Sequence, residues 1–213
     1  MFFPSDIFPV MGVRLTERNA KKINLTSSNP KLSIKATKEV LHAYIFERTK
    51  NYQLWGYGGY LEKRSIYEKL PLFNDKGKFR NIHLGVDIWA EAYCPIYLPY
   101  EGTIYGQDVH EDYGGYGGII IVEHKIKNRS FYSLYGHLSH DSIGMYDEGE
   151  FVEKGEVLGH LGEEAENGHW SPHLHLQFIL DMGNHRRDYP GVCLEEEKAF
   201  YAANCPNPKP FYT

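Results

Sequence analysis

Alternation between apolar and polar side chains is clearest in the segment 173–180, where every second residue from Leu174 to Leu180 is apolar. A period of two is the period of a β-strand, because successive side chains of a strand point to opposite faces of a sheet. The pattern therefore predicts a strand whose apolar face packs on a core. The intervening residues share the other face, and they are His173, His175 and Gln177.

Short apolar runs separated by glycine-rich turns extend this reading over residues 77–181. One run follows the Gly-rich segment 113–118, and another covers residues 131–138. Runs of this kind, bounded by glycine, are typical of short strands in a mainly β protein. Outside this region, residues 40–46 fit a helix or a strand, and the acidic stretch 194–203 favours a short helix.

His83 and Asp87 lie four positions apart in the segment His83-Leu84-Gly85-Val86-Asp87. On a helix this separation would place both side chains on one face. Gly85 and the β-branched Val86 and Ile88 favour an extended or turning segment instead. The sequence has no HExxH motif, the pattern of a zinc-binding helix.

Two histidines and one carboxylate meet the needs of a catalytic zinc site, which uses three protein ligands and leaves a fourth position for water or substrate. A single histidine is usually a structural residue, so only a combination of motifs indicates chemistry. The chain combines HxxxD at 83–87 with HxH at 173–175. A third motif, Tyr-Gly-His-Leu, places His137 at a predicted strand end, where its imidazole is a candidate for acid–base chemistry.

Five segments together resemble one known family, and they are His83–Ala90, Pro95–Gly102, Tyr135–Leu138, Val152–Gly159 and Ser171–His175. In order, spacing and chemistry they are similar to the lysostaphin-type zinc metallopeptidases, which cut peptide cross-links or stems of bacterial peptidoglycan. The resemblance implies the duplicated hybrid motif, a mainly β fold with a β-sandwich or barrel-like antiparallel sheet core. An N-terminal extension and a short C-terminal helix would flank that core here.

The same resemblance implies a role for each candidate residue. His83, Asp87 and His175 would hold one zinc ion per chain, while His137 and His173 would be unliganded catalytic histidines. We assign His137 as the general base and His173 as the group that stabilises the oxyanion, although the sequence alone does not distinguish these two roles.

Two departures from the family pattern concern the surroundings of this site. The residue two positions after the second histidine of the HxH motif is commonly acidic in these enzymes, and it is Gln177 here. The approach to the motif contains Trp170 and an extra histidine, His169, in place of a Gly-rich segment. We expect His169 to be a solvated loop residue rather than a substrate contact.

Length and composition agree with a single globular enzyme domain. The 213 residues suffice for a large core, and we divide them into an N-terminal extension (1–76), a zinc metallopeptidase core (77–188) and a C-terminal tail with a short helix (189–213). The net charge of −5, with acids and bases interspersed, argues against a nucleic-acid partner. The expected partner is a peptidoglycan peptide or another peptide substrate; the oligomeric state stays open.

The expected location is the cytoplasm. The stretch 1–11 carries Asp6 and two prolines and lacks the basic start and apolar run of a signal peptide. No apolar run of transmembrane length occurs in the sequence, so no integral membrane association is expected. Export by an unrecognised route, or a leader already removed, remains the alternative. Cys94, Cys193 and Cys205 form no CxxC motif, and three reduced thiols are the simplest interpretation.

Three classes of function follow from these observations. The first is a zinc metalloendopeptidase that hydrolyses peptide bonds in peptidoglycan peptides. The second is a cytoplasmic zinc hydrolase of another amide or small substrate, favoured by the N-terminus and by the segment 188–192, which is similar to a subset of such domains fused to transferases. The third is a noncatalytic binding module of the same fold, which the complete set of candidate ligands argues against.

Overall fold

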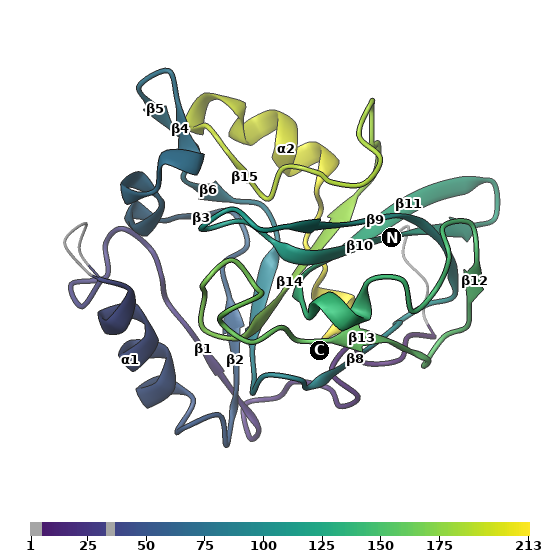
Figure 1. Ribbon diagram of the computed structural model, residues 1–213, viewed down its shortest axis with the longest axis horizontal. Coiled ribbons are helices and arrows are strands. Elements are labelled where there is room, and N and C mark those ends of the chain that lie inside the picture. Colours follow the sequence, from purple (N-terminus) through teal and green to yellow (C-terminus); the bar gives the residue numbers. More distant parts are fainter. Residues whose placement is uncertain (1–5, 33–36) are drawn as a thin grey trace.

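The structure is a computed structural model and describes residues 6–32 and 37–213. Residues 1–5, part of the stretch considered above for a signal peptide, lie outside the described residues. The chain is mainly β, as predicted, with a large sheet through its centre (Figure 1). This sheet has the order β1-β2-β7-β14-β11-β10-β9-β12 and is antiparallel except between β1 and β2. Its strands are β1 (Ala20–Lys22), β2 (Trp55–Gly58), β7 (Val86–Trp89), β9 (Gly102–His110), β10 (Gly117–Ile126), β11 (Arg129–Leu138), β12 (Phe151–Val152) and β14 (His173–Ile179).

Smaller sheets complete the β structure. A three-stranded sheet has the order β15-β6-β3, so that β6, which carries His83, is paired on both sides. A two-stranded sheet joins β13 to β8, and a short hairpin joins β4 to β5. The bounds are β3 (Glu62–Lys63), β4 (Asn74–Asp75), β5 (Lys78–Phe79), β6 (Ile82–His83), β8 (Pro95–Tyr97), β13 (Val157–His160) and β15 (Val192–Cys193).

Two α-helices lie at the periphery of the molecule, α1 at the lower left and α2 at the top of the view (Figure 1). Residues 40–46, for which the sequence allowed a helix or a strand, belong to helix α1 (Lys38–Arg48). The Thr37 hydroxyl caps its first turn, and Leu41 and Ile45 are buried. Helix α2 (Lys198–Asn204) follows a short 3-10 helix and confirms the predicted C-terminal helix. No helix among residues 6–32 and 37–213 is long and apolar enough to cross a membrane. The 3-10 helices are Ser65–Lys69, Pro71–Phe73, His140–Ser142, Glu195–Glu197 and Lys209–Phe211.

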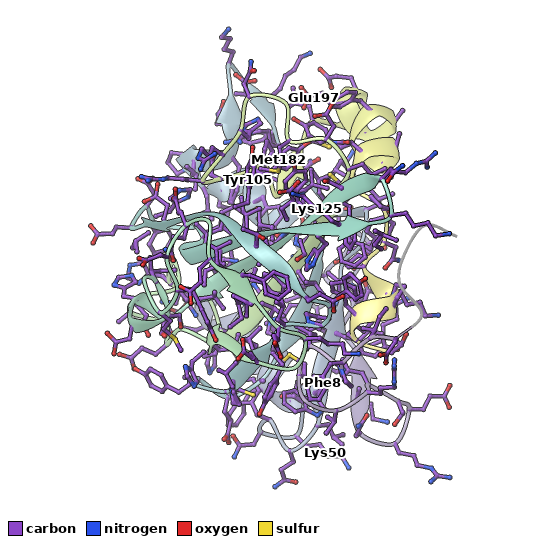
Figure 2. The ribbon with its side chains drawn as sticks, turned by 90° about the vertical axis from the view of Figure 1, so that its right-hand side faces the viewer. Phe8, Lys50, Tyr105, Lys125, Met182 and Glu197 are labelled. Carbon is purple, nitrogen blue, oxygen red and sulfur yellow. The ribbon has the colours of Figure 1, made fainter. Side chains whose placement is uncertain are left out.

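The predicted alternation in the segment 173–180 is present in β14. Leu174, Leu176 and Phe178 are fully buried in the main core, which lies on one face of the large sheet. Leu180 is exposed, because the strand ends at Ile179. In the side-chain view, Phe8 and Lys50 lie towards one end of the molecule and Glu197 towards the other (Figure 2).

A second apolar cluster belongs mainly to residues before β6. It joins α1 to the 3-10 helices through Ile45, Ile66 and Phe73, and it extends to Trp89 in β7. This cluster lies beside the strands that carry the HxxxD motif. Cys94, Cys193 and Cys205 are free thiols, as the sequence interpretation had it.

Candidate metal centre and active site

Three neighbouring strands bring the HxxxD and HxH motifs together. His83 ends β6, the chain turns at Leu84 and Gly85, and Asp87 lies in β7, so the predicted extended or turning segment is confirmed. Strand β14 pairs with β7 in a register that sets His175 directly opposite Asp87. Gly85 permits this approach, since a Cβ atom there would lie 2.7 Å from Nε2 of His175 and 2.6 Å from a backbone oxygen.

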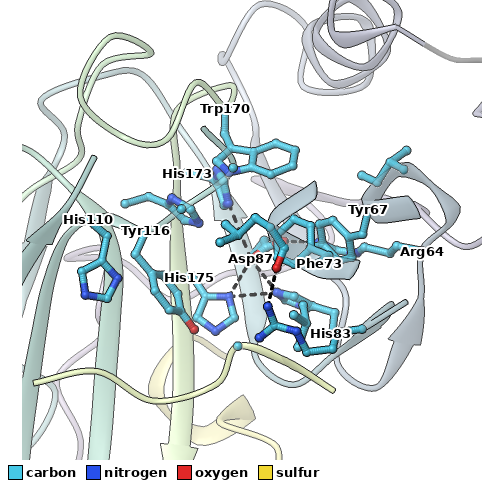
Figure 3. Close-up of a pocket in the computed structure, with 18 of the residues that line it drawn as sticks. Arg64, Tyr67, Phe73, His83, Asp87, His110, Tyr116, Trp170, His173 and His175 are labelled. Carbon is cyan, nitrogen blue, oxygen red and sulfur yellow. Dashed lines mark hydrogen bonds and ion pairs between the residues drawn. The ribbon is translucent and has the colours of Figure 1, made fainter. Parts of the chain in front are cut away.

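His83, Asp87 and His175 present three ligand atoms to one point (Figure 3). Nε2 of His83 lies 2.9 Å from Nδ1 of His175 and 3.1 Å from Oδ1 of Asp87. Nδ1 of His175 lies 3.3 Å from the same oxygen. All three residues are buried, with at most 2% of their surface exposed.

The other ring nitrogens of the two histidines fix their tautomers. Nδ1 of His83 donates to the carbonyl oxygen of Gly59 at 2.9 Å, and Nε2 of His175 donates to Oε1 of Gln177 at 3.0 Å. Gln177 is itself oriented, because its amide nitrogen donates to the carbonyl oxygen of Pro190. The nitrogens that face each other therefore both carry lone pairs.

This donor set fits a zinc ion. Oδ1 of Asp87 accepts no hydrogen bond from any residue that the structure describes, although it is buried. Three electron-rich atoms that converge in a buried place repel one another unless a cation lies among them. A tetrahedral zinc ion with bonds of about 2.0–2.1 Å would separate its ligands by roughly 3.3 Å, which matches this triangle.

Arg64 holds the second oxygen of Asp87. Its Nη1 donates to Oδ2 at 2.7 Å and to the hydroxyl of Tyr67 at 2.7 Å, and its Nε donates to Glu62 at 2.9 Å. No motif spacing connects Arg64 to Asp87, so its contact had no sequence signal.

Burial shapes the electrostatics of the centre. It lowers the pKa of His83 to about 4 and also lowers the pKa values of His137 and His173, because an imidazolium is poorly solvated there. Burial would raise the pKa of Asp87, but neighbouring His83 and the Arg64 guanidinium outweigh it and hold that pKa well below its usual range. The carboxylate is thus the charged form, and these three imidazoles are the neutral form, of their side chains at neutral pH.

His137 and His173 form a second pair next to the triad, with ring centroids 4.2 Å apart. Each donates from Nδ1 to a backbone carbonyl at 2.8 Å, His137 to Asn167 and His173 to Ser171. Their Nε2 atoms therefore carry lone pairs, and Nε2 of His173 lies 3.7 Å from Oδ1 of Asp87. The predicted candidates for acid–base chemistry are thus beside the predicted ligands.

The backbone of His137 has a φ of +63°, a left-handed conformation that is uncommon for residues other than glycine. It is held there at the end of β11 by two backbone hydrogen bonds, from His137 to Tyr116 and from Gly162 to His137. Such conformations cost free energy and cluster at functional sites, so this one agrees with a functional role for His137.

A cavity of about 350 Å³ contains the triad and the histidine pair. Trp89 stacks on His173, and Tyr116 contacts His175 edge-on, so aromatic rings fix two of the imidazoles. His110 and His185, which the sequence left unassigned, also line the cavity. His169 does not: it stacks on Tyr113 and lines a neighbouring hollow of about 330 Å³.

The model of peptidase family M23 matches residues 81–187. A solved structure of a mutant catalytic domain of the prophage-encoded M23 protein EnpA from Enterococcus faecalis is 24% identical, with a TM-score of 0.40, over 55% of this chain and 82% of that chain. The catalytic domain of the antimicrobial peptidase lysostaphin from Staphylococcus simulans is 19% identical, with a TM-score of 0.35, over 59% of this chain and 81% of that chain. A zinc-containing peptidase from Vibrio cholerae is 23% identical, with a TM-score of 0.40, over 56% of this chain and 33% of that chain. No curated protein matches the chain.

Proposed function

Because this chain belongs to peptidase family M23, whose members are zinc metallopeptidases, we propose that it hydrolyses peptide bonds in peptidoglycan peptides and that His83, Asp87 and His175 hold its zinc ion. One observation carries the assignment of ligands. Two imidazole lone pairs and a carboxylate oxygen that lacks a hydrogen-bond donor converge within 3.3 Å of one another in a buried cavity.

Zinc bound there would lower the pKa of a water ligand to about 7 and polarise the scissile carbonyl group as a Lewis acid. His137 supplies the proton transfers, and His173 stabilises the developing negative charge. Nε2 of His137 accepts a proton from the attacking water and passes it to the nitrogen of the leaving amine. Nε2 of His173, when protonated, donates a hydrogen bond to the carbonyl oxygen as negative charge develops on it.

Backbone carbonyls support both roles by holding Nδ1 of each histidine. This leaves Nε2 as the reactive nitrogen and prevents the ring from turning away. Asn167, which holds His137, is itself fixed, because its side-chain amide donates to Gly162 and accepts from the backbone of Trp170. The general base is therefore oriented before substrate arrives, which reduces the entropic cost of the reaction.

Digestion of purified peptidoglycan by the zinc-loaded protein tests this function. New amino termini would be identified by mass spectrometry, and His137→Ala, with the same zinc content, would be the inactive control. Release of defined peptides by the wild type alone is the expected result. No new amino termini from any peptidoglycan type would refute the substrate assignment.

A second candidate substrate is a peptide with a bulky apolar side chain, and one observation favours it. Part of the cavity wall is apolar and comes from residues before β6, namely Leu25, Leu41, Ile45, Ile66, Leu72 and Phe73. A substrate with only small or polar side chains would leave this wall in contact with water, which is unfavourable for apolar surface. A synthetic peptide library with apolar residues on either side of the cleaved bond distinguishes the two candidates: selective cleavage after or before large apolar residues, without attack on peptidoglycan, supports the second.

A further inference from the structure

We propose that Arg64 and Gly59 are positioning residues of the metal centre, so that a segment before the family-matched residues 81–187 completes the zinc site. The inference rests on the proposed role of His83, Asp87 and His175 as ligands. It does not depend on which peptide the protein cleaves. We call residues 59–64, between the end of β2 and the start of the 3-10 helix at Ser65, the positioning turn.

Strand pairing places the positioning turn against both ligands of the HxxxD motif. Gly58, at the end of β2, is directly opposite Asp87 in β7. Glu62, in β3, is directly opposite His83 in β6. The turn therefore spans the same short distance as the link from His83 to Asp87, and the two segments run alongside each other.

Gly59 acts on His83. Its carbonyl oxygen accepts the hydrogen bond from Nδ1 of His83, which directs Nε2 into the metal triangle. Its φ is +103°, and a Cβ atom would lie 2.0 Å from Nη2 of Arg64 and 2.9 Å from Nδ1 of His83. Only glycine gives the carbonyl this direction and also leaves room for the guanidinium.

Arg64 acts on Asp87. The hydrogen bond from Nη1 holds Oδ2, so that only Oδ1 remains to face the two imidazoles. A carboxylate that was free to rotate could offer either oxygen, or both, to the metal. Arg64 thus selects coordination through one oxygen and fixes its direction.

The guanidinium is itself held firmly. Glu62 accepts from Nε of Arg64, and the other oxygen of Glu62 accepts from the backbone of Leu25 at 3.1 Å. The side chain of Arg64 is only 3% exposed, and it pairs with two carboxylates. Groups of this kind, which orient a ligand through hydrogen bonds, typically change metal affinity by about 10–100-fold when they are removed.

The test is the zinc affinity of the purified full-length protein, measured without substrate by competition with a chromophoric chelator. Arg64→Lys keeps the charge but cannot bond Asp87, Tyr67 and Glu62 together, whereas Arg64→Met removes all three bonds. Lys63→Met is the matched control, because Lys63 immediately precedes Arg64 and its exposed side chain pairs with Glu195 instead. Thermal unfolding of the zinc-free proteins would be recorded in parallel, to separate loss of folding from loss of affinity.

We expect zinc to bind roughly tenfold more weakly to Arg64→Lys and up to about 100-fold more weakly to Arg64→Met, with Lys63→Met unchanged. If Arg64→Met does not fold, Arg64→Lys decides alone. Unchanged or tighter zinc binding by a folded Arg64 variant would overturn the proposal and leave Arg64 a purely structural residue. A wild-type protein that binds zinc but cleaves no peptide would contradict the proposed function and leave this inference intact.

Discussion

Residues 81–187 and the described residues before them contribute to the same cavity in different ways. The first part supplies the five side chains to which we assign chemistry, two from each histidine motif and His137 between them. The earlier part supplies no candidate ligand, but it supplies Gly59, Arg64 and the apolar wall. Motifs therefore identify the reactive atoms, while the direction in which those atoms point depends on residues that no motif contains.

Removal of one candidate ligand should have the largest effect. In His175→Ala, the triangle loses Nδ1 and only two donors remain, so we expect zinc to be lost together with all measurable hydrolysis. Elemental analysis after dialysis should find about one zinc per chain in the wild type and none in the variant. His83→Ala and Asp87→Ala should behave alike, and a variant that keeps its zinc would exclude that residue as a ligand.

His137→Ala and His173→Ala should separate catalysis from metal binding within the family-matched part. Neither Nε2 belongs to the metal triangle, so we expect full zinc content with hydrolysis reduced by about 10²–10⁴-fold. His169→Ala is the control, because His169 lies outside the main cavity. Loss of zinc from His173→Ala would instead place that histidine among the ligands.

The sequence predicted the parts of the site that depend on local spacing. Alternation in the segment 173–180 placed His173 and His175 on one strand face, and the structure directs both into one cavity. They do not occupy equivalent places, since alternate residues of a strand are about 6.6 Å apart along its length. Only His175 reaches within 3.3 Å of Asp87, while His173 stays 3.7 Å away.

Long-range pairing explains what the sequence did not reveal. Arg64 reaches Asp87 because β2 pairs with β7 and β3 pairs with β6. The spacing of residues along the sequence does not predict these registers. Gln177 was recognised as a departure from the family pattern. Its role as the acceptor for Nε2 of His175 depends on the orientation of its amide group. That orientation is set by a hydrogen bond to the carbonyl oxygen of Pro190, which sequence spacing does not predict.

The apolar wall, which comes from the residues before β6, gives a test of substrate selection. If the second candidate substrate is correct, Phe73→Ala should lower kcat/KM for peptides with large apolar residues by about 10–200-fold, because it removes part of their pocket. Zinc content should not change, since Phe73 is not one of the three candidate ligands. Phe200→Ala, at an exposed phenylalanine, is the control. Equal losses for apolar and small substrates would show that Phe73 does not select the side chain.

Gln177 can be compared directly with Arg64, because it contacts a candidate ligand but lies within the family-matched residues 81–187. Gln177→Ala removes the acceptor for Nε2 of His175, so zinc should bind about 10–100-fold more weakly. Gln177→Glu restores an acceptor oxygen and should recover most of the affinity. Competition with a chelator measures both variants, and an unaffected Gln177→Ala would show that His175 is oriented by packing alone.

His124 should affect stability without touching the site. It is fully buried between Ser133 and the carbonyl of Glu101, and burial lowers its pKa to about 4. The unfolded chain binds this proton near pH 6.5, so the stabilisation is present above that pH and is lost as the pH falls towards 4. The loss should be on the order of 3 kcal/mol.

Chemical denaturation from pH 7 to pH 4, with the metal removed, measures this effect. His124→Gln should lose less stability than the wild type over that range, because it lacks the titrating group. Phe200→Ala, which changes an exposed side chain without a titrating group, serves as the control and should match the wild type. Equal acid sensitivity of His124→Gln and the wild type would contradict the expectation.

The pairing of strand β6 bears on the order in which the protein assembles. Its neighbours in the three-stranded sheet are β3, which comes before it, and β15, which the ribosome makes only after the HxH strand. Val192 of β15 pairs with His83 itself. Contacts between segments so distant in sequence form late in folding. When His83, Asp87 and His175 have all been synthesised, β15, one of the two strands that pair with β6, is therefore still missing. Metal loading should follow, rather than guide, the folding of this protein.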